Sequence, residues 1–166
     1  MAETEKQVRY DLDGYEVITN ALQEIINIYP GLIEGDKVAF CKLGAEEGKA
    51  MFPISGAIIE TERRDILGGI TQVCLYPFYV VYRVAGLSES RKVAVKEWLD
   101  NLGRWLERQT ITVGDTQYHL AEYPALTGKR SFVGIQRQTP AYLESVSDNQ
   151  VEDWAIYISA RYRNEF

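Results

Sequence analysis

Two short clusters of polar residues have the residue types that bind metal ions or phosphate. The first, Asp11-Leu12-Asp13-Gly14, has the spacing that opens a calcium loop. The later ligand positions hold Tyr15, Val17 and Thr19 instead of the further oxygen donors that calcium requires. We therefore interpret this cluster as the start of a helix, and the sequence predicts no metal site.

The second cluster, Gly44-Ala45-Glu46-Glu47-Gly48-Lys49, resembles a phosphate-binding loop. It is one residue short between its glycines, has no Ser or Thr after Lys49, and places two carboxylates where phosphate groups would lie. It also does not lead into a helix, whose N-terminus would hold the phosphate. The pattern indicates a polar loop between two strands, and the sequence predicts no cofactor.

The residues that most often carry catalysis are few and isolated. His119 is the single histidine, and no nucleophile or second histidine stands near it in the sequence. Cys41 and Cys74 lie in apolar runs without a partner at metal-ligand spacing, so we expect both thiols in the core of a protein of the reducing cytoplasm. Paired carboxylates, zinc spacings and a nucleophile elbow are absent from the sequence. The sequence predicts that the protein is not an enzyme.

Length and composition indicate a single domain over residues 1–166. The 166 residues are 46% apolar, enough to bury a core, and the polar segment 1–10 is expected to be flexible. Asp and Glu number 24 against 18 Lys and Arg, a net charge of −6, which argues against specific nucleic-acid binding. No apolar run approaches the roughly 20 residues of a membrane-spanning helix, so we expect a soluble protein without a membrane partner.

The stretch from Gly68 to Val84 is the strongest structural signal. It is dominated by β-branched and aromatic residues, which is typical of a strand, and glycines bound it. Apolar residues occur at both alternating parities, so we expect at least its middle to be covered on both faces. Pro77 has no backbone N–H to donate, which predicts a bulge, a bend or a local sheet edge.

Two amphipathic helices flank this stretch in the sequence. A capping-box pattern at Asp13, followed by apolar residues at helical spacing, predicts a helix over 14–29. A second helix is predicted over 89–108, with Trp98 and Trp105 on the face that packs on the sheet.

Several shorter apolar runs predict strands. They lie at 38–43, 50–54, 58–64, 110–120, 132–138 and 151–162. The first two are expected to form a hairpin. The sequence thus predicts an α+β fold, with a mostly antiparallel mixed sheet of five to seven strands and two amphipathic helices packed on one face.

The order and character of these elements, taken together, resemble one known family. The shared features are the capped helix, the hairpin, the approach at 65–69, the aromatic strand that ends in Tyr82-Arg83-Val84, the second helix with its two Trp-Leu pairs, and a late strand with Trp154. In this order they are similar to the small minor capsid and tail-terminator (tail completion) proteins of tailed bacteriophages and related phage-tail-like particles. The resemblance spans nearly the whole chain.

The resemblance implies a structural virion protein that assembles as a ring, usually a hexamer, on the end of a tail tube. Such a ring stops tube growth and offers a surface to the head connector. The implied partners are further copies of the chain, the tail tube protein and a head-completion or connector protein. The implied location is the virion, at the head–tail interface, after assembly in the host cytoplasm. Terminator and other completion roles, and contractile and flexible tails, stay open at this point.

Extended, charged segments are where such a subunit would meet its neighbours, because the apolar faces are committed to the fold. Segments of this kind lie at 44–49, 58–65 and 139–150. An acidic balance also suits a ring through whose centre DNA passes without binding. The candidate subunit-contact residues are Glu60, Glu62, Arg63, Arg64, Asp65, Tyr142, Glu144 and Asp148.

A small-ligand or peptide-binding α+β module is the alternative function. A pocket on which Tyr or Trp side chains converge would favour such a module. A flat, wedge-shaped subunit with complementary left and right sides would favour ring assembly.

Overall fold

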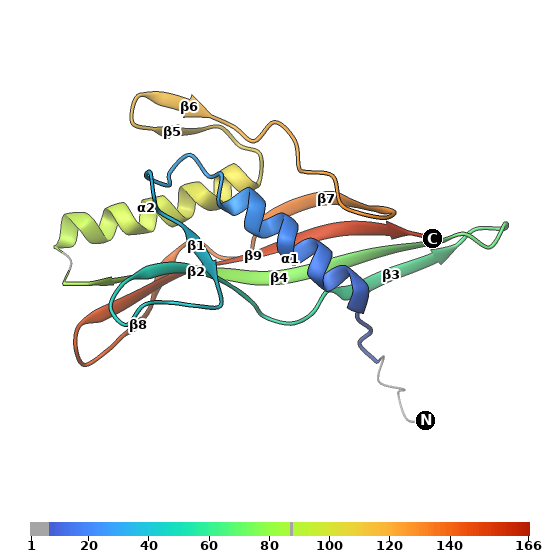
Figure 1. Ribbon diagram of the computed structural model, residues 1–166, viewed down its shortest axis with the longest axis horizontal. Helices are drawn as coiled ribbons and strands as arrows, with labels where there is room; N and C mark the ends of the chain where they lie inside the picture. Colours follow the sequence, from blue (N-terminus) through green and yellow to red (C-terminus); the bar gives the residue numbers. More distant parts are fainter. Residues whose placement is uncertain (1–6, 87) are drawn as a thin grey trace.

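A computed structural model describes residues 7–86 and 88–166, which form one large sheet, two helices and a small separate hairpin (Figure 1). The large sheet has seven strands and is mixed, with all but one of its pairings antiparallel. The α+β fold predicted from the sequence is therefore confirmed.

Two long strands form the centre of the sheet. β4 (Ile70–Ala85) has 16 residues and β9 (Val151–Glu165) has 15, and they pair antiparallel along nearly their whole length. The strands predicted at 68–84 and 151–162 are confirmed and are each other's longest partner. This pair runs along the long axis of the molecule (Figure 1).

Each outer side of the central pair holds two shorter strands placed end to end. β2 (Gly48–Pro53) and β3 (Ile58–Arg64) both pair with β4. β7 (Arg130–Arg137) and β8 (Tyr142–Val146) both pair with β9. The two ends of the sheet are therefore built from different hairpins: β3 with β4 at one end, and β8 with β9 at the other (Figure 1).

β1 (Val38–Phe40) pairs with β2 in parallel, so the predicted hairpin of the first two strands is wrong. The segment 41–47 returns the chain to the start of β2 and does not form a tight turn. It is held beside β4, where Arg83 Nη1 donates a hydrogen bond of 3.0 Å to the Gly44 carbonyl oxygen. Two short apolar runs can form either a parallel pair joined by a longer connection or an antiparallel hairpin. The local sequence pattern therefore does not distinguish these two arrangements.

Pro77 lies in the gap between β2 and β3. The β2 pairing ends opposite Phe78, and the β3 pairing begins opposite Leu75. The Pro77 carbonyl oxygen accepts a 3.0 Å hydrogen bond from Ile54 N. In an antiparallel strand the backbone nitrogen and carbonyl oxygen of one residue point to the same side, so the Pro77 nitrogen also faces this gap. The missing N–H therefore costs no ladder hydrogen bond. Of the three expectations for Pro77, the local edge is confirmed.

Both predicted helices exist, with different ends from those expected. They are α1 (Leu12–Ile26) and α2 (Glu89–Leu106). The capping box predicted at Asp13 is wrong, because Asp11 is the N-cap and its side chain accepts a hydrogen bond of 3.0 Å from Gly14 N. Helix α1 consequently begins before the residue expected.

The helices cover one face of the sheet. From α1, the Thr19 hydroxyl lies 2.8 Å from the hydroxyl of Tyr76 on β4, and the two share a hydrogen bond. From α2, Trp98 packs edge-on against Tyr82, also on β4, with 5.2 Å between ring centroids. Trp105 is buried in the core and Trp98 is half-buried. The predicted packing of the two helices on one face is confirmed.

The opposite face carries a row of four aromatic rings that crosses the strands. Phe52 on β2 stacks on Tyr79 on β4 at 5.2 Å, Tyr79 stacks on Tyr157 on β9 at 5.1 Å, and Tyr157 stacks on Tyr142 on β8 at 6.2 Å. Val81 on this face is only 4% exposed. The middle of β4 is therefore covered on both faces, as its two-sided apolar pattern predicts.

The predicted strand at 110–120 is a separate hairpin. It consists of β5 (Ile111–Val113) and β6 (Thr116–Tyr118), which pair with each other and, among the described residues, with no other strand. His119 follows this hairpin and is exposed.

The N-terminal segment is joined to β3, where Ile59 N donates a hydrogen bond of 2.9 Å to the Arg9 carbonyl oxygen. Residues 9 and 10, within the segment 1–10 expected to be flexible, are thus paired with the start of β3. Residues 1–6 of that segment lie outside the described residues.

The two thiols lie in different environments, which permits a simple test of the fold. Cys74 is fully buried and burial raises its pKa to about 11, whereas Cys41 is exposed, so the expectation that both are core residues is wrong for Cys41. At pH 8 we expect DTNB to modify Cys41 within minutes and Cys74 only after unfolding, because a buried, protonated thiol does not react. Rapid modification of both thiols in the native protein would contradict this packing.

Candidate functional site

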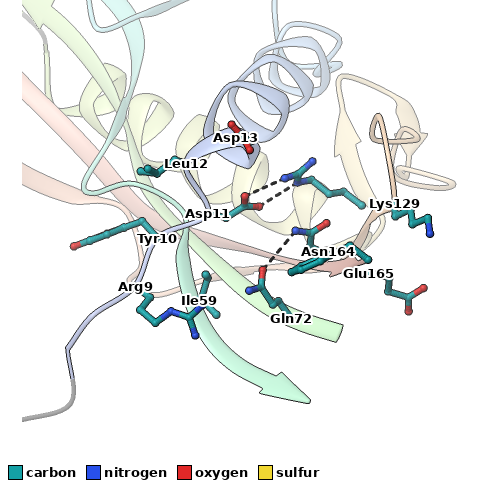
Figure 2. A pocket seen from close by; sticks show the side chains of 12 residues that line it. Arg9, Tyr10, Asp11, Leu12, Asp13, Ile59, Gln72, Lys129, Asn164 and Glu165 are labelled. Atoms are coloured by element: carbon teal, nitrogen blue, oxygen red, sulfur yellow. Dashed lines mark hydrogen bonds and ion pairs between the residues drawn. The ribbon is translucent and has the colours of Figure 1, made fainter. Parts of the chain in front are cut away.

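An open cavity of about 540 Å³ lies where the start of α1 meets the ends of β3, β4, β7 and β9 (Figure 2). Charged and amide side chains provide much of its lining, among them Arg9, Asp13, Lys129, Asn164 and Glu165. Figure 2 shows that these side chains come from segments far apart in the sequence. The cavity therefore gathers polar side chains that could bind or react with a ligand.

Asp11 is the most densely bonded side chain beside this cavity. Its Oδ2 accepts hydrogen bonds from the Tyr162 hydroxyl at 2.7 Å and from Arg130 Nε at 3.1 Å. Its Oδ1 accepts from Arg130 Nη2 at 3.0 Å and from Gly14 N at 3.0 Å. A side chain at position 14 could not fit, because a Cβ there would lie 2.5 Å from the Tyr162 hydroxyl oxygen. A carboxylate has about four acceptor positions, and these four donors occupy them.

Hydrogen bonds within this cluster stabilise the ionised form of Asp11. Burial alone would raise the pKa of Asp11, but hydrogen bonds from Arg130, Tyr162 and Gly14 outweigh burial and lower it. Burial, followed by the hydrogen bond to Asp11, raises the pKa of Tyr162. An ionised carboxylate without a free acceptor position is unsuited to abstract a proton. The cluster caps α1 and joins it to β7 and β9, which is a structural role.

The predicted contact residues of β3 are mostly engaged within the chain. Glu60 accepts two hydrogen bonds from Arg161, at 2.9 and 3.2 Å. Glu62 accepts from Gln72 Nε2 at 2.8 Å and from Arg9 at 3.4 Å, and the hydrogen bonds from these two side chains lower its pKa. Both carboxylates are therefore neutralised by neighbours on the same subunit.

Asp65, in the turn that follows β3, is hydrogen-bonded by backbone groups but forms no ion pair within the described residues. Asp65 Oδ1 accepts hydrogen bonds of 2.8 Å from the backbone N–H groups of Leu67 and Gly69. Arg63 and Arg64 are exposed, and within the part of the chain that the structure describes neither forms an ion pair. The unpaired charges of residues 63–65, two arginines against Asp65, thus sum to a net positive charge.

The other predicted contact residues lie at the opposite end of the sheet. Tyr142 ends the aromatic row, and Glu144 accepts a hydrogen bond of 2.7 Å from the Tyr157 hydroxyl, which raises the pKa of Tyr157. Asp148 is exposed in the turn between β8 and β9. The segment 44–49, also singled out from the sequence, lies beside this hairpin, since Glu46 lines one cavity with residues of β8. The unneutralised charge at this end is negative.

The structure therefore separates the eight predicted residues into two groups and does not gather them into one site. The group on β3 lies beside residues 70–75 of β4, and the group on and after β8 lies beside the other end of the β4–β9 pair.

Sequence reasoning missed Ile66 and Leu67, which are almost wholly exposed in the turn between β3 and β4. The sequence feature that could have indicated them is the apolar pair between Asp65 and two glycines, because residues in turns are normally polar.

Other classes of site are not found in residues 7–86 and 88–166. No group of three or more His, Cys, Asp or Glu side chains there is placed to hold a metal ion. Within the same residues, neither helix is long and apolar enough to cross a membrane.

No protein-family model matches the chain, and no curated protein sequence matches it.

Proposed function

We propose that this chain is a structural subunit of a tailed phage or phage-tail-like particle, and that six copies form a ring that caps the tail tube and joins it to the head connector. The observation that carries the proposal is the placement of two hairpins with unneutralised charge of opposite sign at opposite ends of one sheet. A subunit with two unlike, complementary ends associates head to tail, and such contacts close into a ring when the rotation between copies permits.

The order of elements supports the same proposal. The features on which the phage-protein resemblance depends, including the aromatic strand β4, the tryptophan helix α2 and the late strand β9, belong to one continuous sheet and its cover. The ligand-binding alternative has less support, because charged and amide side chains make up much of the lining of the cavity beside Asp11, and Tyr10 is the one Tyr or Trp among its lining residues.

The proposal predicts an assembly whose size is limited. We expect native mass spectrometry to show closed rings, predominantly hexamers, either for the protein alone or after addition of tail tubes. Electron microscopy should then place the protein at the tube end only. A polar contact between subunits is modest in affinity, so isolated monomers at micromolar concentration are compatible with the proposal. Uniform binding along the tube wall, or tubes that stay uncapped at every concentration, would contradict it.

A further inference from the structure

The turn between β3 and β4 presents two aliphatic side chains to solvent on an ordered support. Ile66 is fully exposed and Leu67 is 92% exposed. The turn itself is closed by the Asp65 side chain and by backbone hydrogen bonds, including Asp65 N to the Gly69 carbonyl oxygen at 2.9 Å. This hairpin projects from the end of the molecule (Figure 1). We call residues 63–67 the hairpin tip.

A groove of about 650 Å³ lies elsewhere on the molecule, between the last turns of α1 and the segment 120–125. Its apolar lining includes Ile25, Ile28, Leu120, Tyr123 and Pro124. Ile28 is 67% exposed at its edge, whereas Ile25 is buried. The groove is thus an accessible apolar surface, and Glu24 and Glu122 stand at its rim.

Hydrogen bonds hold the wall of this groove in position. The Tyr123 hydroxyl donates to the Leu106 carbonyl oxygen at 2.7 Å and accepts from Ile135 N at 3.3 Å. Arg108 donates to the carbonyl oxygens of Leu120 and Ala121. The segment 120–125 is therefore tied to α2 and β7 and cannot simply close onto α1.

The charges of the hairpin tip and the groove are complementary. Arg63 and Arg64 precede the apolar pair of the tip, with Asp65 between, so the tip is net positive, and Glu24 and Glu122 flank the groove. Both arginines and both glutamates are exposed, and in the described parts of the chain none of them forms an ion pair. An apolar centre with a charged rim is the normal composition of a protein interface.

We propose that the hairpin tip of one copy inserts into the α1 groove of the next copy, with Ile66 and Leu67 in the groove and the two arginines against its acidic rim. This inference rests on the proposed self-association and assigns the acceptor of the tip to the α1 groove instead of the acidic β8–β9 hairpin. Tip and groove are different patches, so the contact is heterologous and repeats around an axis. The acidic β8–β9 hairpin offers charge to the arginines, but the groove offers both charge and an apolar surface.

Cysteine cross-linking tests the contact directly. In a Cys41→Ser background, with buried Cys74 retained, two variants carry a single exposed thiol: Leu67→Cys and Ile28→Cys. Both positions are exposed, so neither change should disturb folding. An equimolar mixture treated with a short bismaleimide at up to ~1 mM protein, which captures even weak association, should give covalent dimers that join residues 67 and 28. Each variant alone should give few, because neither site faces itself.

A matched mixture of Leu67→Cys with Asp148→Cys examines the competing acceptor. Preferential linkage of residue 67 to residue 148 would overturn the tip-and-groove contact in favour of the acidic hairpin. Closed rings in native mass spectrometry without 67–28 linkage would also overturn this contact and leave the ring in place. Linkage of 67 to 28, together with non-covalent filaments of unlimited length in electron microscopy, would support the contact and contradict the ring. Absence of any linkage at the highest concentration would overturn the contact.

A charge exchange gives an independent readout. The double change Arg63→Glu with Arg64→Glu should raise the dissociation constant for self-association by at least about tenfold, as should Glu24→Lys with Glu122→Lys. Mixing the two variants should restore association, because opposite charges then face each other. Val93→Asn, which alters an exposed apolar residue of α2, serves as the control and should have no effect. Failure of the mixture to recover would argue against pairing of these charges.

Discussion

Replacing Asp11 by Ala is expected to lower the free energy of unfolding by about 3–5 kcal/mol, the usual cost of removing one partner from a buried ion pair. The substitution leaves the guanidinium of Arg130 and the hydroxyl of Tyr162 without their acceptor in a site where the two partners of the ion pair are only 15% and 7% exposed. It also removes the N-cap of α1. Urea-induced unfolding followed by far-UV circular dichroism measures the loss.

Two further substitutions separate the contributions at this site. Asp11→Asn keeps a side chain that can cap the helix but removes the charge, so we expect a smaller loss than for Ala. Asp13→Ala changes the exposed acidic residue of the same helical turn and is expected to cost less than about 1 kcal/mol. Equal effects of Asp11→Ala and Asp13→Ala would show that the buried cluster does not stabilise the fold.

The pH dependence of the Asp11 contribution follows from the direction of its pKa shift. The fold lowers the pKa of Asp11 from its ordinary value of 3.8, so the ionised carboxylate stabilises the folded state. Asp11 therefore contributes fully to the free energy of unfolding when the pH is above its pKa in the unfolded chain. This contribution is lost as the pH falls through the lower pKa that Asp11 has in the folded protein. The stability difference between the parent and Asp11→Asn should therefore be constant between about pH 5 and 8 and shrink below about pH 4.

Replacing Leu102 by Ala is expected to cost about 3 kcal/mol, because a fully buried aliphatic side chain on the core face of α2 leaves a cavity. For a domain of this size the melting temperature should fall by roughly 6–12 °C. Val93→Ala on the same helix provides the control, since Val93 is 61% exposed and its change should stay within about 0.5 kcal/mol. A melting temperature for Leu102→Ala within a degree of the parent would show that this face of α2 is not core.

The local sequence pattern was sufficient to predict most of the helices and strands. The alternation in β9 placed Trp154, Ile156 and Ile158 on one face and Asp153 and Tyr157 on the other, and the structure has them so. Helical spacing likewise identified the buried side of α2. These patterns identify helices and strands because each element buries one face. Apolar residues therefore recur with the period of that element, about 3.6 residues in a helix and two in a strand.

The candidate site was less accessible to the same reasoning. The charged segments of β3 and β8 were named from the sequence, but their position at opposite ends of the sheet depends on β4 and β9 pairing over their whole length. The sequence also did not show that Glu60 and Glu62 are neutralised by Arg161 and Arg9, which left the arginines as the available charge.

The start of α1 shows most clearly which decisions belong to tertiary structure. Asp11 and Asp13 are both suitable caps by residue type, and the sequence alone favoured Asp13. The structure uses Asp11 because Arg130 and Tyr162, 119 and 151 residues away along the chain, converge on it. The sequence by itself determined most of the elements, their buried faces and the absence of catalytic motifs, since these depend on neighbouring residues, but it did not predict the strand β8. The tertiary structure decided the strand pairing, the choice of the α1 cap and the exposure of the hairpin tip. These features depend on contacts between residues that lie far apart in the sequence, which a local periodic pattern does not reveal.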